Sequence, residues 1–120
     1  MGWKFTDNHK DYDYYIGKII DDIEFVVDST KGLTFEEFES DILLNNAICF
    51  RFIQISENAK KIPNSIYAKY SNIPWAQISG LRNRIVHDYG NIQLYVIFNT
   101  VIDDLPRLLS NLKDIIKVQN

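Results

Sequence analysis

Hydrophobic positions recur with helical spacing along most of the chain. Between Tyr12 and Val27, apolar residues follow one another at steps of three or one, which places them along one side of a helix. Gly32 comes soon after this segment and is a plausible C-terminal cap. The alternation with period two that is typical of strands is absent over any useful length. The pattern therefore predicts an all-α protein.

A second helical region is expected from Phe35 to about Ile62, with a bend near Ser40–Asp41. Thr34 and Glu37 have the spacing of a capping box at its start, and Pro63 stops it. It carries two apolar stripes, Leu44, Ile48, Phe52, Ile55, Ala59 and Ile62 on one side, and Leu43, Ala47, Phe50 and Ile53 on another. We therefore expect a central helix that is buried on two sides, inside the bundle and also against a second copy of the chain.

The rest of the sequence predicts a short helix and loop over residues 64–73 and then a helix that begins at Pro74. The inner face of that helix is predicted to consist of Trp75, Ile78, Leu81, Ile85 and Val86. Gly90 marks its end, and Asn91 is a reasonable N-cap for the last segment.

A heptad-like seam runs through the last segment, formed by Leu94, Phe98, Val101, Leu105, Leu108, Leu112 and Ile115. Pro106 should kink or break the helix at Asp103–Leu105. The whole is predicted to be an antiparallel bundle of four or five helices in one domain, residues 1–120, of which residues 1–10 are an N-terminal extension.

Composition agrees with an ordinary globular domain, since 46% of the 120 residues are hydrophobic and 24% are charged. The single cysteine, Cys49, lies in an apolar run and is expected to be a buried, inert thiol, as suits a reducing cytosol. The sequence shows neither an apolar run of membrane-spanning length nor a signal-peptide core at its start. We therefore expect a cytoplasmic protein that does not contact a membrane.

Charge is distributed unevenly. Residues 1–50 hold four Lys or Arg and eleven Asp or Glu, whereas residues 51–87 hold six Lys or Arg and Glu57 as their one acidic residue. A basic middle in an acidic chain favours a polyanion on one face, although solvated helix surfaces explain the same charges equally well. The neighbouring carboxylates Asp21 and Asp22 are expected on a solvated face rather than at a paired site.

The stretch from Leu81 to Gly90 brings an arginine, an amide, a histidine and a tyrosine together beside apolar positions. His87 can move a proton near neutral pH, and Arg82 can hold a phosphate and stabilise added negative charge. Asn83 can orient either group, and Tyr89 can stack on a base. These are the parts for metal-independent RNA cleavage. RNA cleavage uses both a general acid and a general base, and one histidine does not readily serve as both. A symmetric dimer would supply a second histidine.

A purely structural role for these residues stays open, because a histidine at a helix end is often a cap and an arginine one turn earlier is often salt-bridged. A metal site or cofactor site is not expected: the histidines are only His9 and His87, and Cys/His clusters and glycine-rich phosphate loops are absent. Arg84 is interpreted as an RNA contact or a surface residue.

The motif Arg82-x4-His87-x-Tyr89 resembles that of the HepT-like toxins in the HEPN superfamily of ribonucleases. Asn83 directly after the arginine, the segment Ile73-Pro74-Trp75 before it and Asp104-Leu105-Pro106 after it also fit that family. The resemblance covers roughly residues 12–116. One departure is Ser56, where the family often has glycine before the glutamate of its central helix.

The resemblance implies a dimerising all-α bundle and an endoribonuclease that needs no metal, with Arg82, Asn83 and His87 as catalytic residues. It implies a type VII-like toxin–antitoxin system in which a minimal nucleotidyltransferase antitoxin of the MntA type transfers AMP to Tyr89. The alternative within the superfamily is a non-catalytic adaptor that binds a nucleotidyltransferase, and an inert helical scaffold is a third possibility.

Overall fold

The structure of the chain is a computed structural model, and it describes residues 11–91 and 93–119, apart from the side chains of Asp11, Tyr89 and residues 117–119. The described residues form helices and no strand, so the predicted all-α class is confirmed. The expected N-terminal extension, residues 1–10, lies outside the described residues. Across the described ranges, we find no helix with the length and apolar character that a membrane crossing requires.

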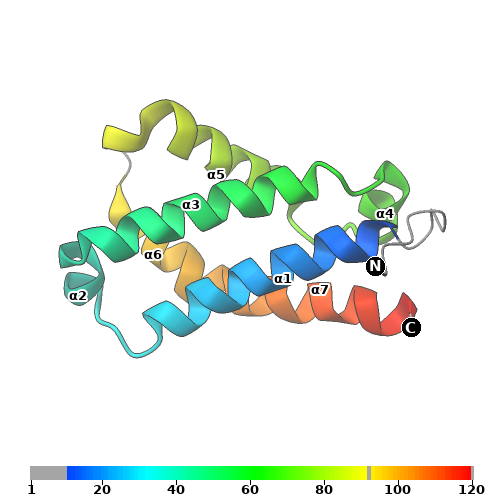
Figure 1. Cartoon of the computed structure of the whole chain (residues 1–120), viewed down its shortest axis with the longest axis horizontal. Coiled ribbons are helices and arrows are strands. Elements are labelled where there is room, and N and C mark those ends of the chain that lie inside the picture. The colour runs from blue at the N-terminus through cyan, green and yellow to red at the C-terminus, as the bar shows by residue number, and fades with distance from the viewer. Residues whose placement is uncertain (1–10, 92, 120) are drawn as a thin grey trace, which may run out of the picture.

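Four long helices build the bundle, namely α1 (Asp11–Thr30), α3 (Ile42–Ala59), α5 (Trp75–Asp88) and α7 (Leu105–Gln119). Helix α3 packs against both α1 and α5, and α7 packs against α1. In Figure 1, α5 lies above α3, and α1 and α7 lie below α3. The short helices α2 (Phe35–Ser40), α4 (Asn64–Lys69) and α6 (Leu94–Asn99) complete the described architecture.

Local signals set the predicted boundaries of the first helices. Thr34 accepts a hydrogen bond from the Glu37 N–H at 3.1 Å, and the Glu37 carboxylate accepts one from the Thr34 N–H at 2.9 Å, which confirms the capping box. Gly32 has φ +80°, the left-handed conformation that ends a helix. The expected bend is also confirmed, because Asp41 separates α2 from α3 and caps α3 through the Leu44 N–H at 3.0 Å.

Helix geometry changes in front of Pro106, as predicted. Residues Thr100–Asp104 form a π-helical turn, η3, between α6 and α7. Pro106 has no N–H, so the carbonyl four residues earlier has no α-helical donor at that position, and the helix adjusts there.

Asn91 was predicted to cap the last segment, and this is wrong. Helix α6 begins at Leu94 with Gln93 at the N-cap position, while Tyr89–Asn91 form a 3-10 turn, η2. The Asn91 amide instead donates to the Asp88 carboxylate at 2.9 Å. It therefore acts at the end of α5 rather than at the start of α6.

The core lies where the predicted stripes meet. Its fully buried members come mainly from three segments: Ile16, Ile19, Ile23 and Val26 of α1; Ile48 and Ile55 of α3; and Leu112 and Ile115 of α7. Cys49 is buried, as expected, and burial raises the pKa of its thiol to about 11, which favours the protonated thiol at neutral pH.

Three apolar residues that were expected to be buried are exposed in the single chain. Leu43 is 83% exposed and Phe50 57% exposed on α3, and Val86 is 43% exposed on α5. The reason is geometric, because the long helices that contact α3 are α1 and α5, and one side of α3 is left uncovered. Burial of α3 on both apolar sides is therefore not achieved within one chain.

Asp22 also departs from expectation. It was predicted on a solvated face, but it is 7% exposed and accepts a hydrogen bond from Arg51 Nη1 at 2.7 Å. The guanidinium of Arg51 in turn lies 4.0 Å from the centre of the Phe25 ring. An arginine on α3 therefore satisfies the buried carboxylate and helps to hold α1 against α3.

Candidate active site

The start of α5 is anchored near the end of α3. The Tyr67 ring stacks on the Trp75 ring with centroids 4.6 Å apart, and the Tyr67 hydroxyl donates to the Ala59 carbonyl. The Trp75 indole N–H donates to the Tyr70 carbonyl at 3.3 Å. These contacts fix where α5 begins, and therefore how far along α3 each of its residues lies.

Burial of Ile85 fixes the rotation of α5 about its own axis. Ile85 is only 2% exposed, and the half-buried Ile78 lies seven residues earlier, on the same side of the helix. Arg82 is four residues after Ile78 and three before Ile85, so it shares that side. A charged residue on a packed side needs a counter-charge, and its side chain is 24% exposed.

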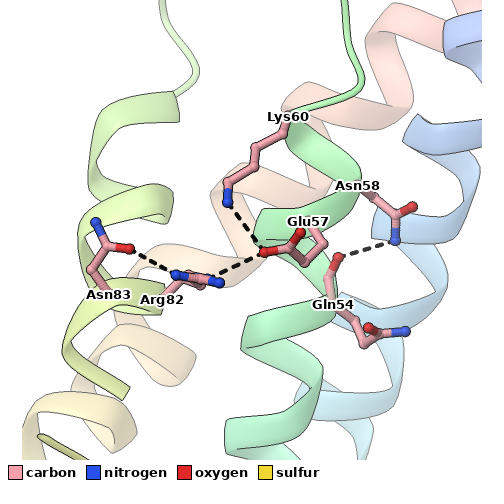
Figure 2. Close-up of polar contacts among 6 residues, drawn as sticks. All are labelled: Gln54, Glu57, Asn58, Lys60, Arg82 and Asn83. Atoms are coloured by element: carbon pink, nitrogen blue, oxygen red, sulfur yellow. Dashed lines mark hydrogen bonds and ion pairs between the residues drawn. The ribbon is translucent and has the colours of Figure 1, made fainter. Parts of the chain in front are cut away.

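Glu57 of α3 supplies the counter-charge. Its Oε2 lies 3.2 Å from Arg82 Nε and 3.2 Å from Lys60 Nζ, while Arg82 Nη1 donates to the Asn83 side-chain oxygen at 3.1 Å (Figure 2). Arg82 Nε is buried, and its contact with Glu57 is an ion pair without hydrogen-bond alignment. The guanidinium is thus held between a carboxylate on one helix and an amide on the other.

The ionisation of Glu57 follows from its neighbours. The hydrogen bond from Lys60 lowers the pKa of the Glu57 carboxyl, and the charges of Lys60 and Arg82 lower it further, against a smaller opposing effect of desolvation. Glu57 is therefore an anion at neutral pH. Arg82 faces this anion directly, and the pair connects α5 to α3.

Glu57 was not among the residues that the sequence singled out as a site. A signal for it existed, because Glu57 is the one carboxylate between residues 51 and 87, among six Lys or Arg. A lone acid in a basic region has a good chance of being paired, but the sequence does not show with which cation. In the structure, Glu57 forms ion pairs with Arg82 and Lys60.

Asn83 and His87 lie on the exposed side of the last two turns of α5. They are four residues apart and therefore neighbours on one face. His87 is five residues from Arg82, about 140° around the helix axis. The structure thus brings Arg82 and Asn83 into contact, places His87 beside Asn83, and leaves Arg82 and His87 on different sides of the helix.

Helix α5 stays α-helical through Asp88 and is followed by a 3-10 turn. After His87 and Asp88, the 3-10 turn η2 begins at Tyr89, whose backbone is described and whose side chain is not. Within the described residues, no three His, Cys, Asp or Glu side chains come close enough together to hold a metal ion. The described side chains of the site offer a guanidinium, an amide and an imidazole.

Comparison with known proteins gives a consistent result. Residues 19–115 match the family model described as "Ribonuclease HepT-like". The chain is 31% identical over 101 residues to "Probable ribonuclease HepT" of Thermococcus cleftensis, covering 84% of this chain and 89% of that protein. It is 30% identical over 103 residues to "Putative RNase TTE0752" of Caldanaerobacter subterraneus subsp. tengcongensis, covering 86% and 92% respectively. No solved structure gives a significant match.

We predict that Lys60→Gln raises the pKa of the Glu57 carboxyl toward the ordinary value of 4.5, because it removes the hydrogen bond that lowers it most. The pKa is measured from the carboxyl carbon chemical shift of Glu57 during an NMR pH titration. The matched control is Lys61→Gln, which removes the same charge one residue further along and should leave the titration midpoint in place. An unchanged midpoint in Lys60→Gln would contradict the ion-pair geometry described above.

Proposed function

Because the chain belongs to the HepT-like ribonuclease family, we propose that it is the toxin of a toxin–antitoxin pair and an endoribonuclease that cleaves RNA without a metal ion. The observation that carries this proposal is the arrangement at the end of α5. Arg82 is held by Glu57 and Asn83, while Asn83 and His87 share an exposed face one turn apart. A cation held on one side of α5 and an exposed proton carrier on another side are both groups that attack on a phosphodiester uses.

The reaction uses the RNA itself as nucleophile. The 2′-oxygen attacks the adjacent phosphorus as His87 takes the 2′-OH proton, and the bond from phosphorus to the 5′-oxygen of the next nucleotide breaks. The products are a 2′,3′-cyclic phosphate and a 5′-hydroxyl, which needs a proton from an acid. Arg82 stabilises the additional negative charge on the phosphoryl oxygens, and Asn83 orients Arg82 or donates to the same oxygens.

A homodimer would supply the second proton carrier. Leu43, Phe50 and Glu57 follow one another at seven-residue spacing on α3 and therefore lie on one side of it. The first two are exposed apolar residues, and the third binds Arg82 of the site. A two-fold contact through this side of α3 would bury the apolar residues and bring two copies of the motif toward one cleft.

Regulation is proposed to act at Tyr89. A cognate nucleotidyltransferase of the MntA type would transfer AMP to its hydroxyl, two residues after His87. The adduct would add bulk and negative charge next to the place where an RNA phosphate reacts, and repulsion would then exclude the substrate. The residue that the antitoxin modifies would thus lie in the same ten-residue stretch as the catalytic set.

His87→Ala is expected to lower the rate constant for RNA cleavage by about 10²–10⁴-fold, because it removes the proton carrier. Cleavage is measured with a labelled single-stranded RNA in the presence of EDTA. His9→Ala, which removes the other histidine of the sequence, is the control and should cleave at the rate of the unaltered chain. RNA cleavage that persists in His87→Ala would refute the assignment, and a stable nucleotidyltransferase complex without any cleavage would favour the adaptor function.

Phe50→Asp is expected to convert a dimer into a monomer, since a charge would be placed in the apolar part of the proposed contact. Sedimentation velocity or light scattering gives the mass in solution. Ile102→Asp is the matched control, because Ile102 is also exposed, at 46%, but belongs to η3 rather than α3. If both variants keep the mass of the unaltered protein, the α3 side is not the dimer contact.

Co-expression with the cognate nucleotidyltransferase is expected to add the mass of AMP to the chain. Tyr89→Phe lacks the accepting hydroxyl and should stay unmodified under the same conditions, as intact-mass spectrometry would reveal. Tyr95→Phe is a suitable control, because Tyr95 is a nearby exposed tyrosine at 51% on α6. Adenylylation of the Tyr89→Phe chain would place the modification elsewhere.

A further inference from the structure

A cavity of about 550 Å³ lies against the side of α5 that bears Arg84. Its lining comes from α3, from the segment before α5, from α5 itself, and from α6, η3 and α7. The volume falls in the range of sites for small molecules and cofactors. None of the residues proposed for catalysis lines it, so it is a separate feature of the molecule that α5 shares with the active site.

The chemistry of the lining is divided between an apolar part and a polar part. The apolar part includes Phe52 and Ile55 of α3 and Leu108 of α7, all of which are buried. The polar part includes Arg84 and Arg107, the carboxylate residue Asp104, and the amide residues Asn72, Gln77 and Asn111. An apolar surface with an aromatic ring suits a base, amides suit the hydrogen-bonding edge of a base, and arginines suit a phosphate.

Gly80 shows that the cavity has free space on the side of α5. It lines the cavity in the middle of α5, and a Cβ built on it would meet no atom within 4 Å. Packing within the chain therefore does not require glycine here, although glycine is among the poorest helix formers. The missing side chain leaves the space open on the cavity side of α5.

The cavity also lies close to the proposed cleavage site. Gly80, Arg84 and His87 follow one another at steps of four and three, so they lie along one side of α5. From Gly80 to His87 the helix rises about 10 Å. An RNA strand that reacts at His87 can thus continue over Arg84 to the cavity.

The charged residues of the cavity lining are two arginines, Arg84 and Arg107, and one aspartate, Asp104. Arg107 forms an exposed ion pair with Asp104 at 3.5 Å, which is a weak contact that water screens. Arg84 is exposed, and no ion pair of Arg84 is found among the described residues. At least one guanidinium at the cavity is therefore available to a phosphate.

We propose that this cavity is a nucleotide subsite, which holds an unpaired base of the RNA next to the cleaved phosphodiester while Arg84 binds its phosphate. The inference rests on the proposed ribonuclease function and gives it a physical basis for base preference. Single-stranded RNA is recognised in this way when a base leaves the stack and enters an apolar, amide-lined pocket.

The test measures the binding of a fluorescent single-stranded oligoribonucleotide to chains that carry His87→Ala, so that the probe stays intact. Adding Gly80→Phe should raise Kd about tenfold or more, because the ring fills the space of the base. The matched control is Gly17→Phe on α1, where a Cβ also meets no atom within 4 Å. This control should bind like the parent, and circular dichroism should show the same helix content for both variants.

A second variant tests the phosphate contact without filling the cavity. Arg84→Gln should reduce the slope of log K against log salt concentration by about 0.7, the loss expected for one phosphate contact of a single strand. Lys113→Gln removes a charge that does not line the cavity, because Lys113 of α7 pairs with Glu24 of α1 at 3.0 Å, and it should leave the slope unchanged.

The outcomes separate this inference from the proposed function. Unchanged Kd in Gly80→Phe together with an unchanged salt slope in Arg84→Gln would overturn the subsite, even if the unaltered chain cleaves RNA. A change in the mass of the Gly80→Phe protein with unchanged RNA affinity would also overturn it, and would assign the cavity to a contact with another protein chain. Tight, cavity-dependent binding by a chain with intact His87 that never cleaves RNA would support the subsite and refute the ribonuclease function instead.

Discussion

The position of Arg82 on the packed side of α5 is the constraint from which the rest of the site follows. Ile78 and Ile85 determine which side of α5 faces the bundle, and Arg82 lies between them. A guanidinium there needs an anion, and Glu57 is the carboxylate that α3 offers. The ion pair is partly exposed, so it contributes little to stability, but it sets the direction of the side chain. Once Arg82 points toward α3, Asn83 and His87 must point away from the core.

Ion pairs within the fold also change how the basic segment, residues 51–87, is interpreted. Of the six cations between residues 51 and 87, Arg51 binds Asp22, and both Lys60 and Arg82 bind Glu57. Much of the local positive charge is therefore engaged within the fold. The charge that is left for a polyanion includes Arg84, on the cavity side of α5, so a count of charges along the sequence overstates the basic surface and conceals where it lies.

Most of the helices could be predicted because their causes are local. Apolar spacing, the Thr34–Glu37 capping box, Gly32 and Pro106 act within a few residues, and the structure confirms each of them. The arginine, amide and histidine were likewise identified together, because they share one helix. Their contacts were harder to predict: the hydrogen bond from Arg82 to Asn83 is local, but the ion pair of Arg82 with Glu57 joins residues 25 positions apart.

Other features could not be predicted from local signals, because each of them depends on which elements pack against a helix. Leu43, Phe50 and Val86 have the sequence pattern of core residues, and only the arrangement of α1, α3 and α5 shows that one side of the bundle is uncovered. Asp22 has the pattern of a surface residue, and only α3 shows that Arg51 reaches it. The cavity beside α5 was missed for the same reason, since its lining is assembled from segments between Phe52 and Asn111.

The geometry of α5 finally bears on why two copies of the chain would be needed. Transfer of a proton from the 2′-OH and of another to the leaving oxygen requires two groups in the course of one reaction. Among the described residues of one chain, His87 is the one imidazole, and Arg82 points to another side of the helix and is held there by Glu57. Rotating Arg82 toward His87 would break its ion pair with Glu57, which would then keep only Lys60. A second copy that meets the uncovered side of α3 would instead bring its own histidine and arginine without disturbing either pair, so the exposed apolar residues and the single histidine point to the same assembly.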